Sequence, residues 1–178
     1  QTNQSVTVTV LDVNEPPVSN SKSVDINEDA ALNTRVTDIK CSDPDASDTS
    51  FKFSIDSGNV GSKFTLTMAT TASANIALVD ILDYENVNEY QLRIGIFDSV
   101  DNKAVISVFI IVNDVNERPS FSTSSKSIVS ISENAAGNTN VGEPFQANDV
   151  DKGDRITYKL ISLSTDIDSN NFFYKIGR

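Results

Sequence analysis

The sequence of 178 residues contains no histidine and no tryptophan, and Cys41 is its only cysteine. Without histidine the chain lacks the commonest general base, and it shows neither a glycine-rich phosphate loop nor a nucleophile with a visible partner. We therefore expect no enzyme. A typical zinc or copper site is also excluded, because such sites use histidine or cysteine ligands. A single cysteine excludes an internal disulfide framework, and its register with Ile39 predicts a small buried hydrophobic residue.

Basic residues are few and long apolar runs are missing. Fourteen Lys and Arg residues stand against 25 Asp and Glu residues, which gives a formal net charge of -11. This charge argues against nucleic acid and anionic membrane surfaces as partners and favours cations. The longest apolar run, Val105 to Val112, is far shorter than the roughly 20 residues that a spanning helix needs. We expect no membrane contact by this segment.

What the sequence does contain is a strict alternation of apolar and polar residues in many short segments. This period of two, with β-branched and aromatic residues, predicts half-buried strands. About seven such strands in about a hundred residues predict an all-β fold of two antiparallel sheets packed face to face. The alternating apolar residues are Val6, Val8 and Val10; Phe51, Phe53 and Ile55; Phe64 and Leu66; Ile76 and Leu78; Tyr90, Leu92, Ile94 and Ile96; and Ile106, Val108, Ile110 and Val112.

An acidic tetrapeptide occurs twice. Residues 12–15, Asp-Val-Asn-Glu, return as residues 114–117, and each copy closes an alternating run and precedes a proline. Other acidic residues repeat at a similar distance: Glu28 corresponds to Glu133, and the pair Asp43 and Asp45 corresponds to Asp149 and Asp151. A self-match at a fixed period indicates one structural unit used again. We expect a window from a longer protein, with the end of one repeat in residues 1–14, a complete repeat in 15–116 and a truncated repeat in 117–178.

The repeated acidic residues are candidate metal ligands. They sit beside turns, where side chains converge without burying the polar edge of a strand. Ca²⁺ takes six to eight oxygen ligands from carboxylates, carbonyls and water in loose geometry, and a set of carboxylates with asparagine fits this preference. Each motif taken singly has a simpler interpretation: Asp43-Pro44-Asp45 is more often a solvated turn, Asp98 is a possible strand-end cap, and Tyr84 is a packing residue.

Taken together, these motifs resemble those of extracellular cadherin repeats. The Asp-Val-Asn-Glu segments look like the Asp-x-Asn-Asp/Glu linker of that family, and Glu28 looks like the glutamate near the start of a repeat. Asp43-Pro44-Asp45 is similar to its Asp-x-Asp motif, and Leu82-Asp83-Tyr84-Glu85 is similar to its Leu-Asp-x-Glu motif. The resemblance implies tandem seven-stranded Greek-key β-sandwiches of immunoglobulin-like architecture, joined by calcium-binding linkers.

The resemblance also implies the calcium ligands, because the family holds ions between successive repeats. For the first junction they are Asp12, Asn14, Glu15, Asp43, Asp45 and Asp98, with the carbonyl of Pro16. For the second junction they are Glu28, Asp83, Glu85, Asp114, Asn116, Glu117, Asp149 and Asp151, with the carbonyls of Val115 and Arg118. The upstream half of the first junction and the counterpart of Asp98 in the second are expected beyond this chain. Where many cadherin linkers have Asp followed by Asn, this chain has Glu15-Pro16 and Glu117-Arg118.

Partners and location follow from the same resemblance. It implies calcium-dependent cell adhesion, with other cadherin-like ectodomains, homophilic or heterophilic, or matrix proteins as partners. It implies an extracellular position, in the ectodomain of a single-pass plasma-membrane protein or in a protein secreted into matrix. The glycosylation sequon Asn3-Gln4-Ser5 is compatible with that position. The alternative function is a metal-independent immunoglobulin-like or fibronectin-like spacer. The absence of tryptophan excludes the strand exchange that some cadherins make with an N-terminal Trp.

Overall fold

The computed structural model describes residues 4–121, 130–140, 142, 144–163 and 172–175. Asn3 of the predicted sequon lies outside these residues. The chain divides into two compact units, unit 1 (Gln1–Val115) and unit 2 (Asn116–Arg178). No helix in the described parts of the chain is long and apolar enough to cross a membrane.

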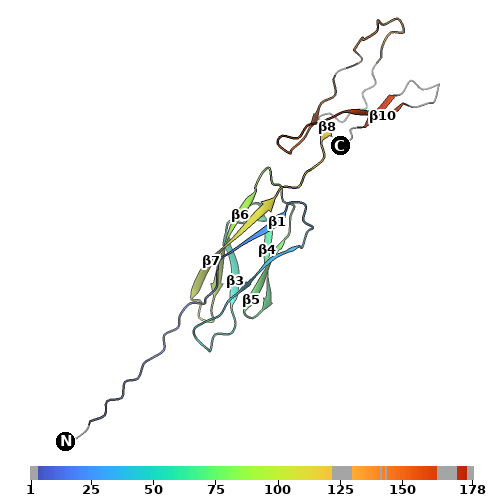
Figure 1. Ribbon diagram of the computed structural model, residues 1–178. Coiled ribbons are helices and arrows are strands. Elements are labelled where there is room, and N and C mark those ends of the chain that lie inside the picture. The colour runs from blue at the N-terminus through green and yellow to red at the C-terminus, as the bar shows by residue number, and fades with distance from the viewer. Residues whose placement is uncertain (1–3, 122–129, 141, 143, 164–171, 176–178) are drawn as a thin grey trace. The chain divides into compact units, whose positions relative to one another are not determined.

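Unit 1 is a sandwich of two sheets (Figure 1). Its four-stranded sheet has the order β1-β7-β6-β3, and its three-stranded sheet has the order β2-β5-β4. A single 3₁₀ turn, Val60–Ser62, precedes β4. The predicted all-β fold with seven strands in a repeat is confirmed. The strands are β1 (Lys22–Asn27), β2 (Arg35–Lys40), β3 (Lys52–Ser57), β4 (Phe64–Thr70), β5 (Ser73–Leu78), β6 (Glu89–Phe97) and β7 (Lys103–Asn113).

The core of unit 1 is built from alternate residues of the two sheets. In β6, Leu92, Ile94 and Ile96 are fully buried, and Tyr90 packs edge to face against Phe64 of β4, with ring centroids 5.0 Å apart. Each fully buried aliphatic side chain contributes roughly 1.5–3 kcal/mol through burial. The sandwich therefore has enough apolar burial to fold without disulfides.

Two strand predictions were wrong in part. The first sheet is not wholly antiparallel, because β1 pairs with β7 in parallel, with Ile26 opposite Val112. Antiparallel pairing is forced only on strands joined by a hairpin, and the chain passes from β1 to the other sheet. The predicted strand at Val6, Val8 and Val10 is neither half-buried nor paired with another described segment; these side chains are 81–89% exposed. A strand forms only against a neighbour, and the described chain provides none there.

Unit 2 contains short antiparallel pairs. Strand β8 (Ser120–Phe121) pairs with β9 (Ala147–Asn148), and β10 (Lys159–Leu163) pairs with β11 (Phe172–Lys175). The backbone N–H of Ala147 donates to the Tyr158 hydroxyl at 3.0 Å. Phe121 and Phe145 make an edge-to-face contact with ring centroids 6.3 Å apart. The domain boundaries expected from the repeat remain a prediction.

Candidate metal centre

In unit 1 the first copy of the repeated tetrapeptide is held against two distant acidic residues. The side-chain amide of Asn14 donates to Asp98 Oδ2 at 2.6 Å and to the carbonyl of Glu15 at 3.0 Å. The Glu15 N–H donates to Asp45 Oδ2 at 2.9 Å. Asp45 and Asp98 are buried, with 6% and 1% of their surface exposed. The segment that precedes β1 is thus tied to two loops of the sandwich by carboxylates.

The loop after β2 presents its acidic residues through a local turn. Pro44 fixes its own φ and disfavours a helical Asp43. The Asp45 N–H donates to Asp43 Oδ1 at 3.0 Å, and the Asp48 N–H donates to the Asp45 carbonyl at 3.0 Å. Asp43 Oδ2 is buried and has no hydrogen-bond donor among the described residues. A buried carboxylate oxygen without a partner is costly, and a bound cation would offset this cost.

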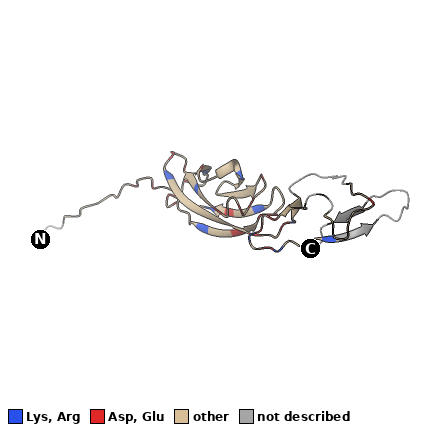
Figure 2. Cartoon of the chain, turned by 90° about the horizontal axis from the view of Figure 1, so that it is seen from above, with Lys and Arg blue, Asp and Glu red and all other residues tan. Residues whose placement is uncertain are grey.

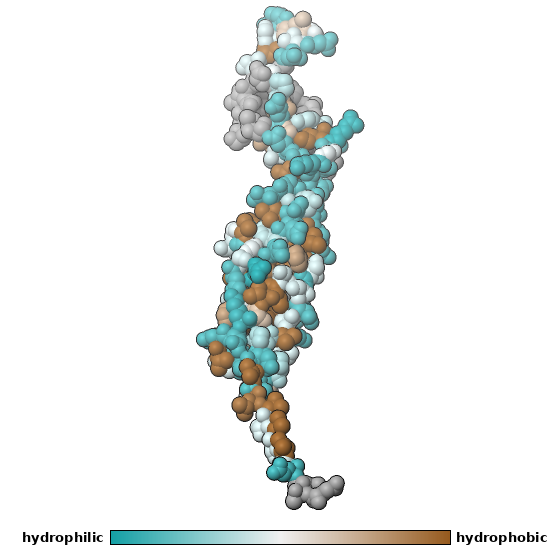
Figure 3. Space-filling model, turned by 90° about the vertical axis from the view of Figure 1, so that its left-hand side faces the viewer, coloured by the Kyte–Doolittle hydropathy of each residue, from teal (hydrophilic) through white to brown (hydrophobic). Residues whose placement is uncertain are grey.

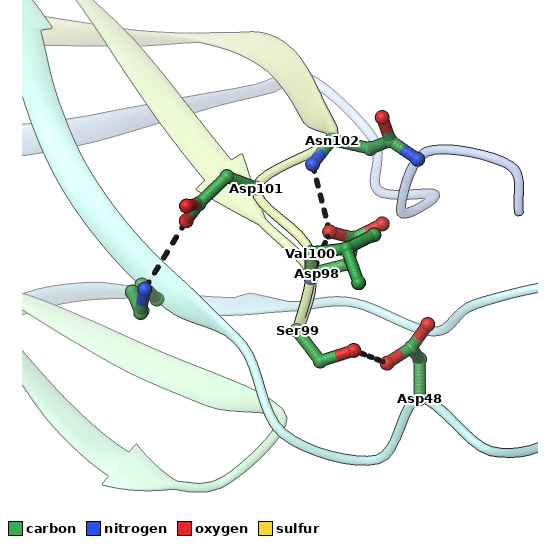
Figure 4. A network of polar contacts seen from close by, with 7 residues as sticks. Asp48, Asp98, Ser99, Val100, Asp101 and Asn102 are labelled. Atoms are coloured by element: carbon green, nitrogen blue, oxygen red, sulfur yellow. Dashed lines mark hydrogen bonds and ion pairs between the residues drawn. The ribbon is translucent and has the colours of Figure 1, made fainter.

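Asp98 ends β6 and organises the turn into β7. Its Oδ1 accepts the N–H groups of Val100 at 2.9 Å and Asn102 at 2.7 Å (Figure 4). Burial is the largest influence on the pKa of Asp98 and raises it, but the hydrogen bonds from Asn14, Asn102 and Val100 together lower the pKa below its usual value. Asp98 is therefore both the strand-end cap and a charged residue at the candidate site.

Two groups of carboxylates in unit 1 lie close enough to hold a metal ion. One oxygen from each of Asp12, Glu15 and Asp45 lies within 4.8 Å of the others, and the same holds for Asp43, Asp48 and Asp98. Like charges at this separation repel, and burial strengthens the repulsion. The ligand set contains only oxygen, which matches a hard cation such as Ca²⁺. The residues present fit the ion that the sequence predicts.

Another part of unit 1 places Glu28 between two backbone segments. The Glu28 side chain, with 5% of the residue exposed, accepts the N–H of Tyr84 at 2.6 Å and the N–H of Val115 at 2.8 Å. Glu85 offers one oxygen within 4.8 Å of a Glu28 oxygen and one within 4.8 Å of an Asp114 oxygen. Tyr84 packs against the core, as predicted. The glutamate near the start of the repeat thus joins the Leu-Asp-x-Glu segment to the second copy of the tetrapeptide.

In unit 2 the second copy repeats the arrangement of the first. The Glu117 N–H donates to Asp151 Oδ2 at 2.9 Å, the same length as the bond from Glu15 to Asp45. The Asn116 amide donates to the Glu117 carbonyl at 2.6 Å and to Asp151 Oδ2 at 2.8 Å. The Asp151 N–H donates to Asp149 Oδ1 at 3.3 Å. Three of these hydrogen bonds repeat those of the first copy, but the Asn116 amide donates to Asp151 whereas the Asn14 amide donates to Asp98.

Two of the predicted ligands make other contacts. Asp83 and Asp149 belong to none of the three-carboxylate groups found among the described residues. Each accepts a nearby backbone N–H instead: Asp83 Oδ1 accepts that of Asn86 at 2.9 Å, and Asp149 accepts that of Asp151. Each lies two positions before a residue that does join such a group, Glu85 and Asp151 respectively. Their assignment as ligands remains a prediction.

One acidic residue was missed from the sequence. Asp48 is buried, accepts a hydrogen bond from the Ser99 hydroxyl, and shares a carboxylate group with Asp43 and Asp98 (Figure 4). A signal existed, because Asp154 follows Asp151 by three residues as Asp48 follows Asp45. Both copies therefore contain Asp-x-Asp-x-x-Asp, and both close a turn from the last aspartate N–H to the middle aspartate carbonyl.

Comparison with known proteins finds a family model described as Cadherin domain, which matches residues 22–113. The mouse protein "Cadherin EGF LAG seven-pass G-type receptor 1" is 34% identical over 162 residues, which are 88% of this chain and 5% of that protein. Human "Protocadherin-23" is 31% identical over 169 residues, 93% of this chain and 5% of that protein. The chain thus spans about a twentieth of the length of these relatives.

Solved structures give the same fold. The crystal structure of human protocadherin-24 EC1-2 matches with a TM-score of 0.61 and 23% identity, over 84% of this chain and 69% of that chain. Extracellular cadherin domains 3-6 of protocadherin gamma B2 match with a TM-score of 0.60 and 24% identity, over 85% of this chain and 38% of that chain. At this identity the likeness concerns the fold alone.

Proposed function

This chain belongs to the cadherin family, and on that premise we propose that it is a calcium-binding segment of the extracellular part of a cell-adhesion protein. Its function is mechanical and connective: calcium held at the repeated acidic tetrapeptides fixes the chain between successive repeats. The partners we propose are other cadherin-like ectodomains, of the same or another kind, or matrix proteins. We propose no catalytic role.

One observation carries the proposal. Both copies of the tetrapeptide make the same backbone hydrogen bond, from Glu15 to Asp45 and from Glu117 to Asp151, each at 2.9 Å. A bond of this kind places the backbone of the glutamate beside the Asp-x-Asp loop in both copies. Repetition of this arrangement supports a shared ligand, because an ordinary turn needs no such accumulation of negative charge.

In unit 1 the residues that would hold calcium are the two groups of carboxylates. When bound, Ca²⁺ supplies positive charge that offsets their mutual repulsion and accepts their oxygens as ligands. Asp43 contributes a buried oxygen that has no donor among the described residues. Asp45 and Asp98 already hold the linker residues Glu15 and Asn14. The chain's own contacts thus hold the linker beside the loops that carry these carboxylates.

For the second tetrapeptide the proposal rests on the sequence. Unit 1 contributes Glu28, Asp83, Glu85 and Asp114, and unit 2 contributes Asn116, Glu117, Asp149 and Asp151. We propose that these two sets bind the same ions, so that calcium stiffens the chain around residues 114–117. We expect an affinity on the order of 10⁻⁴ to 10⁻³ M, as for other extracellular calcium modules.

The test is a calcium titration of the whole chain, followed by thermal unfolding and by small-angle X-ray scattering. On going from chelator to millimolar calcium, we expect the melting temperature to rise. We also expect the distribution of molecular dimensions obtained from scattering to narrow. The variant Asp45→Asn should weaken this response, because it removes a buried negative charge from the site. A matched control is Asp29→Asn, an exposed aspartate of unit 1 outside the carboxylate groups found among the described residues. Unchanged melting and scattering on calcium addition would favour the metal-independent spacer instead.

A further inference from the structure

Ser99 joins two loops of unit 1 whose aspartates converge. It follows Asp98 in the turn between β6 and β7, and its hydroxyl donates to Asp48 Oδ1 in the loop between β2 and β3 (Figure 4). The two bonded residues are 51 positions apart in sequence. Ser99 belongs to none of the carboxylate groups found among the described residues. The proposed ligands therefore do not account for this contact.

The Asp48 carboxylate depends on Ser99 for its orientation. Among the described residues, Ser99 is the sole hydrogen-bond donor to the Asp48 side chain. The other two members of the group are held by backbone N–H groups close in sequence: Asp43 Oδ1 accepts that of Asp45, and Asp98 Oδ1 accepts two N–H groups of its own turn. Such local bonds form as each turn folds. Asp48 is instead oriented by a side chain from another loop.

Mutual repulsion acts against this orientation. Oxygens of Asp43, Asp48 and Asp98 lie within 4.8 Å of one another, and Asp48 and Asp98 are only 9% and 1% exposed. Acidic and basic residues both occur on unit 1 (Figure 2), yet none of the four ion pairs found among the described residues includes these three carboxylates. Like charges repel more strongly where burial lowers the dielectric constant. Without a donor beside it, we expect the Asp48 side chain to turn away from the other two.

We propose that Ser99 is a positioning residue for calcium, because its hydroxyl holds the Asp48 carboxylate in the group with Asp43 and Asp98. A ligand that is already oriented loses less conformational freedom when the ion binds, so the hydroxyl raises the calcium affinity of this group. Ser99 acts through Asp48 and not as a member of the group. The inference rests on the proposed function and deepens it, since it names a residue that sets the affinity of one site.

The exposure of Ser99 determines the size of the expected effect. Removal of a hydrogen-bond partner of a metal ligand typically lowers metal affinity by about 10- to 100-fold. Ser99 is exposed, and hydrophilic residues are spread over the face of unit 1 that Figure 3 shows. Water at such a surface can take over part of the role of the hydroxyl. We therefore expect the lower end of the range, about tenfold.

The first experiment compares Ser99→Val with Ser99→Thr in the full chain, because the two new side chains have nearly the same shape and differ in the hydroxyl. Calcium is titrated and followed by NMR at the amides of Val100 and Asn102, whose N–H groups bond to Asp98 and so report on this group. Ser99→Val should raise the calcium concentration at half-saturation about tenfold, whereas Ser99→Thr should stay within about twofold of the wild type. A merely structural hydroxyl would instead lower the melting temperature equally in chelator and in calcium, with unchanged calcium affinity.

The second experiment tests whether Ser99 acts through Asp48. Asp48→Asn keeps an oxygen that accepts the hydroxyl but removes the charge, so it should weaken calcium binding, and Ser99→Val should then add little to its effect. The control is Asp101→Asn, which removes the same charge from an exposed residue of the same turn whose ion pair with Lys52 contributes little to stability. Because exposed charges are screened by salt, this control should stay within about twofold of the wild type.

The outcomes separate this inference from the proposed function. Equal calcium affinities of Ser99→Val and Ser99→Thr, or a full effect of Ser99→Val in the Asp48→Asn background, overturn the inference alone. A rise in the wild-type melting temperature without a response of the Val100 and Asn102 amides does the same. If calcium changes neither these amides nor the melting temperature of the wild type, the proposed function is overturned together with the inference. Circular dichroism and thermal unfolding establish that each variant folds.

Discussion

The buried carboxylate of Glu28 accepts the backbone N–H of Tyr84 at 2.6 Å. Its other oxygen accepts the N–H of Val115, so one side chain joins three parts of unit 1 that are far apart in sequence. The same residue is a predicted calcium ligand, and its two roles can be separated experimentally.

Glu28→Gln should destabilise unit 1 in chelator by about 1–3 kcal/mol, because an amide offers only one acceptor oxygen to two N–H donors. Thermal or denaturant unfolding measures this cost. The control is Glu133→Gln, at the corresponding exposed position of the next repeat, and it should change stability by less than about 0.5 kcal/mol. Equal effects of the two substitutions would contradict the structural role of Glu28.

Asn14→Asp should destabilise the chain in chelator and increase the stabilisation that calcium gives. The substitution replaces an amide that donates to Asp98 at 2.6 Å by a second carboxylate, and like charges at that distance repel. We expect a lower melting temperature in chelator and a larger rise on calcium addition than in the wild type. The double variant Asn14→Asp with Asp98→Asn should lose much of this repulsion. A double-mutant cycle measures the interaction energy between positions 14 and 98. Simple additivity would show that the two side chains do not interact.

Gly58→Ala should cost far more stability than Gly61→Ala. Both glycines have positive φ, at 86° and 65°, and an alanine there costs roughly 1–2 kcal/mol. At Gly58 the added Cβ would also lie 1.8 Å from the Gln91 carbonyl oxygen, a backbone atom of β6, whereas at Gly61 it meets only the flexible Lys63 side chain at 3.3 Å. Urea unfolding of both variants measures the difference. Similar losses of stability in the two variants would mean that the loop at Gly58 can move away from β6 without destabilising the protein.

Cys41 should react slowly with iodoacetamide at pH 8. Burial first, and the negative charge of Asp43 second, raise the pKa of its thiol from 9.0 to about 11. The reactive thiolate is then about a hundredfold scarcer than for an ordinary cysteine at that pH. Because the folded pKa is raised, the thiol's contribution to stability is complete below pH 9 and is lost as the pH rises through about 11. The test compares the rate of Cys41 alkylation in the folded protein, in chelator, with the rate in denaturant. Equal rates would contradict the raised pKa of the thiol.

The strands show how far local pattern determined this fold. Alternation in residues 90–96 and 106–112 predicted β6 and β7 with the correct buried side chains, because period two is a property of the strand itself. Alternation at Val6, Val8 and Val10 is just as regular, yet no described strand pairs with it. The same limit explains the parallel pairing of β1 with β7. Pattern identifies which residues prefer a strand, but pairing depends on which segments the chain brings together.

The sequence by itself determined that the chain is a β-sandwich repeat and that two acidic tetrapeptides mark equivalent positions. Both conclusions rest on periodicity and repetition, which are local or internal to the sequence. Only the tertiary structure decided that Asp48 joins Asp43 and Asp98, and that Glu28 holds Tyr84 and Val115. These contacts join residues from separate loops and strands. The distances between such residues depend on tertiary packing, which a local sequence pattern does not determine.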